Sequence, residues 1–272
     1  MGVNRQDVGL LLRLRRQGYL PDQARVVELG AQQLSHDVLA DRDLVKEFGK
    51  SFGQSDEPPL PQAEGEAKFN GIEQVLDPNA PMARLMWLWL GLGYTAIDID
   101  GSPDSIPLDL NFDDVPQSER SKYHLVTNYG TTEHVANQMN ALKIAHDLAT
   151  PDGVMVHHLP CQGNFNHGLL NYSPKFFWML ARSNDYGWLY FDHVNSEISY
   201  PLPENVIESV RPYRTDIDER MAQYRVSNTS LVVALQKRWD RPFVPPIDVP
   251  NGTITSDQNL LERYPTVFKR SN

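Results

Sequence analysis

Three short motifs with a glycine or an acid follow apolar runs in the first half of the chain. They are Glu28-Leu29-Gly30-Ala31-Gln32, Ala96-Ile97-Asp98-Ile99-Asp100 and Leu108-Asp109-Leu110-Asn111. A glycine after a buried strand lets the backbone turn and approach a ligand without a Cβ in the way. A carboxylate at a strand end can accept hydrogen bonds from ribose hydroxyls or an adenine amino group. Each motif alone is equally typical of an ordinary strand-end turn, so the prediction depends on their order.

Four side chains that can hold or move a proton follow the expected fourth and fifth strands. They are Glu133, His134, His167 and Tyr172. Histidine suits acid–base work because the ordinary pKa of imidazole lies near neutrality. We expect these groups to face a substrate, with Phe165 and Asn166 of the polar loop 160–168 contacting it. The alternatives are a His134 buried at the start of a helix and a loop-stabilising hydrogen bond at His167.

A histidine-rich metal site is the competing interpretation of the same region. Its candidate ligands are His134, His157, His158, His167 and His193. His157 and His158 are neighbours on one expected strand and therefore point to opposite faces of the sheet. The spacing also matches no tetrahedral zinc pattern. We therefore predict no metal, a prediction that inhibition by chelators would contradict.

Apolar runs and helical periodicity alternate along the chain. Strands are expected at 24–29, 94–99, 105–110, 123–127, 154–159, 188–192 and 230–236, and helices at 6–17, 39–48, 81–90, 132–148 and 174–183. The first helix is expected to cover one edge of the sheet. Such alternation predicts an α/β fold, a doubly wound and mainly parallel sheet with helices on both faces. Ligands of such sheets bind at the carboxyl ends of the strands, where the motifs above are expected.

The spacing of the motifs indicates an insertion. Gly30 and Asp98 are much further apart than the roughly 20 residues that separate a glycine loop from a ribose-binding acid in an uninterrupted unit. We interpret residues 1–272 as a single domain in which segment 35–80 is inserted on the ligand side, as a lid over the substrate or as a peripheral decoration. The proline-rich tail 241–272 is expected to wrap over the surface.

Taken in order, these motifs resemble those of the class I S-adenosylmethionine-dependent methyltransferases, and residues 123–135 resemble the fourth-strand motif of that family. The resemblance covers about residues 25–168 and implies a Rossmann-like, seven-stranded fold, S-adenosylmethionine as cofactor and direct in-line methyl transfer. The implied cofactor contacts are Glu28, Gly30, Gln32, Asp98, Ile99, Asp109, Leu110, Asn128 and Tyr129. The chain departs from the pattern in its first loop, where Gly30 is the only glycine.

Composition narrows the class of substrate. A formal net charge of −10 repels polyanions and disfavours a nucleic-acid substrate. Cys161 is the only cysteine, so no intrachain disulfide forms, and a reducing, cytoplasmic location is expected. The longest apolar stretch, Leu85 to Leu92, is far short of the roughly 20 residues that span a membrane. We therefore expect a small-molecule acceptor and no membrane partner.

Three other functions stay open at this point. A nicotinamide-dependent dehydrogenase would share the fold, but the Gly-x-Gly-x-x-Gly loop is missing after the first strand. The same sulfonium cofactor could instead undergo attack by an internal nucleophile, giving cyclisation in place of methyl transfer. A protein that binds the cofactor without catalysis is the third. Product analysis with labelled cofactor separates these functions.

Overall fold

The computed structural model describes residues 2–61, 80–164, 167–200 and 226–271. Its centre is a seven-stranded sheet in the order β3-β2-β1-β4-β5-β7-β6. The strands are β1 (Arg25–Leu29), β2 (Gly93–Ile97), β3 (Ser105–Ile106), β4 (Tyr123–Tyr129), β5 (Ala149–Gln162), β6 (Gly187–Tyr200) and β7 (Val226–Gln236). The pairs among β1 to β5 are parallel, and β7 runs antiparallel to both of its neighbours. The predicted doubly wound, mainly parallel sheet is confirmed.

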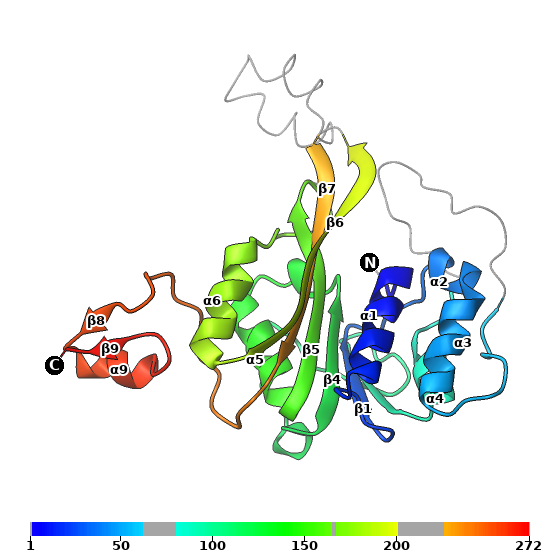
Figure 1. Cartoon of the computed structure of the whole chain (residues 1–272), viewed down its shortest axis with the longest axis horizontal. Coiled ribbons are helices and arrows are strands. Elements are labelled where there is room, and N and C mark those ends of the chain that lie inside the picture. Colours follow the sequence, from blue (N-terminus) through cyan, green and yellow to red (C-terminus); the bar gives the residue numbers. More distant parts are fainter. Residues whose placement is uncertain (1, 62–79, 165–166, 201–225, 272) are drawn as a thin grey trace, which may run out of the picture.

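Helices cover both faces of this sheet (Figure 1). One face carries α1 (Arg5–Arg16), α2 (His36–Ala40), α3 (Arg42–Ser51) and α4 (Arg84–Trp89), and the other carries α5 (Gln138–Leu148) and α6 (Pro174–Asn184). Neighbouring strand residues divide between the two layers: Val26 and Leu125 face α1, whereas Val27 and Val126 face α5. This period of two explains why the strands read as continuous apolar runs, since both faces are buried.

The helix expected over 132–148 and the strand expected over 105–110 are both shorter than predicted, and the helix expected over 81–90 spans only Arg84–Trp89. The helix expected over 132–148 is interrupted, because the 3₁₀ turn η2 (Thr132–His134) comes first and α5 begins only after Asn137, whose side chain accepts a hydrogen bond from the Asn140 N–H. The strand expected over 105–110 ends at Ile106. Pro107 has no N–H for a ladder, and the next residues form a turn in which Asp109 accepts from the Asn111 N–H at 2.8 Å.

The first helix lies on a face of the sheet, so the prediction that it covers an edge is wrong. Its Val8 and Leu11 are fully buried in one core with Val26 of β1 and Leu125 of β4. A helix with apolar residues this broadly distributed must bury them against a sheet face. The amino end of α1 also lies beside the carboxyl end of β1, since Val3 bridges Leu34.

The inserted segment starts and ends at the same place. Gln33 bridges Met82, so the chain leaves and re-enters beside the end of β1. Within 35–61 the structure shows α2 and α3 packed in the core beside α1, with Phe48 fully buried against Trp87. Residues 62–79 lie outside the described part of the chain. A lid role for segment 35–80 therefore stays a prediction.

The carboxyl-terminal tail packs outside α6 (Figure 1). The tail contains β8 (Ile254–Thr255), α9 (Gln258–Arg263) and β9 (Lys269–Arg270). Elsewhere in the chain, the short 3₁₀ helix η1 (Gln117–Glu119) precedes β4. Arg182 of α6 holds the tail by donating to the carbonyls of Ile247 and Val249, at 2.9 and 2.8 Å. Among the described residues, no helix is long and apolar enough to cross a bilayer.

Candidate active site at the carboxyl ends of the strands

The strand order reverses between β1 and β4. From β1 the chain winds outward through β2 and β3, then returns to place β4 on the other side of β1. The loops that follow β1 and β4 therefore leave the sheet in different directions, and the region between their first residues is called the crevice from here on. Crevices at this position are where open α/β sheets bind their ligands.

Gly30 fits the crevice only because it has no side chain. Its φ is +76°, and a Cβ built on it would lie 2.5 Å from Oγ1 of Thr131, the second residue after β4. Thr131 Oγ1 donates to the Leu29 carbonyl at 2.5 Å and accepts from Gln32 Nε2 at 3.0 Å. The loops after β1 and β4 are thereby joined directly across the crevice.

Glu28, in β1, holds the same loop through buried hydrogen bonds. Its carboxylate is fully buried and accepts from the Trp87 indole at 2.8 Å, the Tyr94 hydroxyl at 2.9 Å and the Gln32 N–H at 3.0 Å. Burial raises the pKa of Glu28 to about 7, although the three donors oppose the rise. Both carboxylate oxygens are engaged by the protein, so the role that the structure shows for Glu28 is to hold the loop.

Asp98 lies at the end of β2 and also contacts the loop. Its Oδ2 accepts from the Ala31 N–H at 2.8 Å and its Oδ1 from the Asp100 N–H at 3.3 Å, and the residue is half-buried. The structure thus brings Glu28, Gly30, Gln32 and Asp98 together, as the sequence predicts. Ile99 points away into solvent, with 75% of its surface exposed.

The third motif forms a turn beside α5. Leu110 is buried in the α5 face of the core, and its carbonyl accepts from Asn140 Nδ2 at 3.0 Å. Asp109 is half-buried and, besides accepting from Asn111, places its own N–H 2.8 Å from Asp113 Oδ2. The turn follows β3, two strands away from β1 on the side of β2.

Asn128 and Tyr129 end β4 on opposite faces of the sheet, and both are fully buried. Asn128 donates to Thr132 Oγ1 at 2.8 Å and lies 3.1 Å from Nδ1 of His157, whose pKa burial lowers to about 4. Tyr129 packs in the core beneath α1, and its hydroxyl has no hydrogen-bond partner among the described residues. The pair therefore shapes the crevice from within the sheet.

Glu133, His134 and His167 meet just beyond that crevice. Glu133 and His134 belong to η2, two and three residues after Thr131, and His167 reaches them from the loop between β5 and α6. Glu133 Oε1 lies 3.2 Å from His167 Nε2 and 3.9 Å from His134 Nε2. Partial burial lowers the pKa of His134, and the charge of Glu133 opposes this shift.

Tyr172 occupies a separate position behind this cluster. Its hydroxyl bonds Thr132 Oγ1 at 2.9 Å and also Gln138 Oε1, and burial raises its pKa above the ordinary range. Three of the four predicted proton-handling residues are thus together, and the fourth is linked to them through η2. Phe165 and Asn166, predicted to contact substrate, lie outside the described residues.

An apolar groove of about 530 Å³ runs alongside Tyr172. Its walls come from the start of α5, from α6 with the residues before it, and from the tail; they include Gln138, Met139, Leu170, Tyr172, Phe176 and Pro246. Leu170 follows Leu169, whose N–H donates to the Glu133 carbonyl at 2.8 Å. The groove therefore lies beside the segment that contacts the backbone of Glu133.

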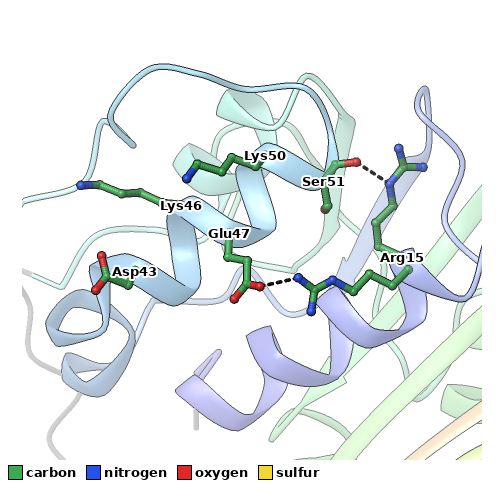
Figure 2. A pocket seen from close by; sticks show the side chains of 7 residues that line it. Arg15, Asp43, Lys46, Glu47, Lys50 and Ser51 are labelled. Carbon is green, nitrogen blue, oxygen red and sulfur yellow. Dashed lines mark hydrogen bonds and ion pairs between the residues drawn. The ribbon is translucent and has the colours of Figure 1, made fainter.

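A larger surface hollow, of about 830 Å³, lies between α1 and α3 (Figure 2). Its walls are charged and already paired, with Arg16 bonded to Glu47 and Arg15 donating to the Ser51 carbonyl at 2.9 Å. This hollow lies at the carboxyl end of α1. The amino end of α1 lies beside the carboxyl ends of the strands, because Asp7 bonds His158 of β5 at 2.8 Å. The hollow is therefore remote from the crevice.

Two residues of this site were not predicted from the sequence. Thr131 closes the crevice against Gly30, and Gln138 joins Tyr172 to η2 by donating to the Thr132 carbonyl at 2.6 Å. Both are common polar residues without a motif of their own. The position of Thr131, directly after the glycine that ends β4, was the one signal available.

Comparisons with known proteins found similarity in structure only. No protein-family model and no curated protein matches the chain. Similar solved structures include the 1,6-didemethyltoxoflavin-N1-methyltransferase of Burkholderia thailandensis with bound 1,6-didemethyltoxoflavin and S-adenosylhomocysteine (TM-score 0.42, 14% identity, 86% of this chain and 77% of that chain). Another is a SAM-dependent methyltransferase from Archaeoglobus fulgidus (TM-score 0.40, 13% identity, 85% of this chain and 94% of that chain). A third is a geranyl diphosphate methyltransferase in complex with SAM (TM-score 0.38, 10% identity, 85% of this chain and 84% of that chain).

The assignment of the fold rests on the sheet itself. Its order, with an antiparallel β7 inserted between β5 and β6, is that of the class I S-adenosylmethionine-dependent methyltransferase fold. The chain has this fold, as the motif order in the sequence predicts.

Proposed function

We propose that the protein is an S-adenosylmethionine-dependent methyltransferase that acts on a small molecule by direct in-line transfer. The crevice between the β1 and β4 loops would take the cofactor, with its ribose hydroxyls at the carboxylate of the half-buried Asp98. The observation that carries the proposal is the Gly30 loop, where a positive φ and the missing Cβ bring bare backbone to the point at which the strand order reverses.

The groove beside Tyr172 supports a small acceptor. Its walls are mostly apolar, and Leu170 in them follows Leu169, whose N–H donates to the Glu133 carbonyl, so a bound molecule would lie beside the segment that carries the cluster. A sulfonium is already an activated methyl donor, and the chain needs mainly to align acceptor and methyl group, exclude water and accept a proton. We assign that proton handling to the cluster and a positioning role to Tyr172.

Calorimetric titration with S-adenosylmethionine and S-adenosylhomocysteine tests cofactor binding. Asp98→Asn keeps an acceptor for the Ala31 N–H but removes the charge, and should weaken binding by about 10-fold or more, since hydrogen bonds to charged groups contribute roughly 1.5–3 kcal/mol. Asp114→Ala is the matched control, because Asp114 is exposed and bonds only Lys143 among the described residues. The proposal would be rejected if the protein bound neither compound, or if Asp98→Asn bound them with the same affinity as the wild type.

Turnover is measured by mass spectrometry with a methyl-labelled cofactor and a panel of small acceptors. Methyl transfer adds the label to the acceptor and leaves S-adenosylhomocysteine. Cyclisation would instead release a fragment of the cofactor without labelling any acceptor. Binding without turnover would favour a non-catalytic cofactor-binding protein.

A further inference from the structure

The contact between Glu133, His134 and His167 has the composition of a metal site. Each residue offers one ligand atom, and these atoms all lie within 4.8 Å of one another. In tetrahedral coordination with bonds of about 2.1 Å, two ligand atoms lie about 3.4 Å apart. The observed separations from Glu133 Oε1, 3.2 Å to His167 and 3.9 Å to His134, bracket that value. The third separation, between the ligand nitrogens of His134 and His167, is within 4.8 Å, so binding requires the half-exposed His134 side chain to turn towards the other two.

The buried state of Glu133 is a second observation. Its side chain has no exposed surface, and its Oε2 has no hydrogen-bond partner among the described residues. Buried carboxylates in folded proteins are almost always fully hydrogen-bonded or paired with a cation, because desolvation of an unpartnered oxygen is costly. An ion bound by both carboxylate oxygens of Glu133 supplies the missing partner of Oε2.

The backbone around the cluster is held in place from both sides. The Leu169 N–H donates to the Glu133 carbonyl at 2.8 Å, and the His167 N–H donates to the Asn164 carbonyl at 3.0 Å. A Cβ on Gly168 would lie 2.7 Å from Glu133 Cγ, so the two loops approach each other as closely as a glycine permits. His134 is 47% exposed, which gives an ion a route from solvent.

We propose that Glu133, His134 and His167 bind one divalent transition-metal ion, with zinc as the ion to test. Two imidazoles and one carboxylate form a ligand set that binds zinc or iron(II) and leaves at least one coordination position free. The bond between His167 and Glu133 in the ion-free chain is then replaced by two bonds to the ion.

The free position would take an oxygen of the acceptor, a use that rests on the proposed function. A bound ion takes over the proton handling that the ion-free cluster would perform: it lowers the pKa of a coordinated hydroxyl, so the O–H bond breaks and the proton passes to water. The oxygen attacks the methyl carbon and an O–C bond forms. The S–C bond breaks, and its electron pair stays on the sulfur as a neutral thioether. The inferred class of acceptor is therefore a small molecule with a hydroxyl group able to coordinate a metal.

Zinc binding is measured by calorimetry on tag-free, chelator-treated protein. The wild type should take up one zinc ion per chain. Removal of a group that only supports a metal ligand costs 10- to 100-fold in affinity, so loss of a ligand in His134→Ala or His167→Ala should cost about 100-fold or more. His193→Ala is the matched control, because His193 is exposed on β6 and should leave zinc affinity unchanged.

A second readout separates ligation from general effects on folding. Cobalt(II) bound by the wild type should give visible absorption bands that are absent in His134→Ala, a half-exposed position where alanine does not disturb the core. No saturable zinc binding by the wild type, or equal affinity in the ligand variants, would overturn the inference. Cofactor titration is read independently, so zinc binding without cofactor binding rejects only the proposed function, and the reverse result rejects only the metal site.

Discussion

Substitution of Gly30 by alanine tests the geometry on which the crevice depends. Gly18 is the matched control, because its φ is +85° and a Cβ there would meet nothing within 4 Å. Alanine in the left-handed region costs roughly 1–2 kcal/mol, so Gly18→Ala should lose only that amount. At Gly30 the new Cβ would lie 2.5 Å from Thr131 Oγ1 and must displace it.

The additional cost at Gly30 follows from the hydrogen bonds of Thr131. Its hydroxyl donates to Leu29 and accepts from Gln32, and each bond contributes about 1 kcal/mol. Gly30→Ala should therefore destabilise the fold by about 3–4 kcal/mol. Thr131→Ala alone should cost about 2 kcal/mol, and because it removes the clashing atoms, the double variant should be only as unstable as Gly30→Ala. The resulting coupling is about 2 kcal/mol, within the usual range for residues in contact.

Urea denaturation of the four variants and the wild type measures these differences as shifts in midpoint at constant slope. The reasoning would be refuted if Gly30→Ala lost no more stability than Gly18→Ala, or if the Gly30 and Thr131 effects were simply additive.

Three further predictions concern buried groups of the site. Burial raises the pKa of Glu28 from 4.5 to about 7, so between these pH values the folded chain keeps a proton that the unfolded chain releases. The stability of the wild type relative to Glu28→Gln should therefore fall by about 3 kcal/mol as pH rises from 4.5 to above 7. A pH-independent difference in urea titrations would contradict this. In Gly168→Ala the new Cβ should press on Glu133, destabilise the fold by about 1–3 kcal/mol and weaken zinc binding. The control is Gly9→Ala in α1, where a Cβ meets nothing within 4 Å and alanine should stabilise the fold by roughly 0.5–1 kcal/mol. Equal effects of the two substitutions in thermal unfolding would contradict the close approach of Gly168 to Glu133. Tyr129→Phe removes a buried hydroxyl without a described partner and should leave stability unchanged or raise it by about 1 kcal/mol, with unchanged cofactor affinity by calorimetry; weaker binding would place that hydroxyl at the cofactor.

The fold could be predicted from the sequence because its strands carry a strong local signal. Val26 and Val27 are both buried, on opposite faces, and this produces the unbroken apolar run of a parallel strand. Element ends were predicted less well. Asn137 starts α5 after a separate 3₁₀ turn, and side-chain capping of this kind depends on contacts that periodicity does not show.

The proximity of Gly30 and Asp98 was also predictable, since both follow strands whose order the motifs indicate; their role at a cofactor stays a proposal. Glu133, His134 and His167 were predicted as proton-handling residues but not as one set of metal ligands. Glu133 and His134 are adjacent, whereas His167 comes from a separate loop more than thirty positions later. A ligand set assembled across two loops has no fixed spacing, so a search for zinc patterns in the sequence does not detect it.

The pair formed by Asp7 and His158 has a consequence for how the protein is made. Asp7 has no exposed surface and bonds a histidine 151 positions later in the chain. On the ribosome, the first helix is synthesised long before β5, so Asp7 has only the Asn4 N–H of its own helix as a partner until more than half of the polypeptide has emerged. The apolar side of the nascent helix therefore stays accessible to chaperones until the fifth strand joins the sheet and brings His158 to Asp7.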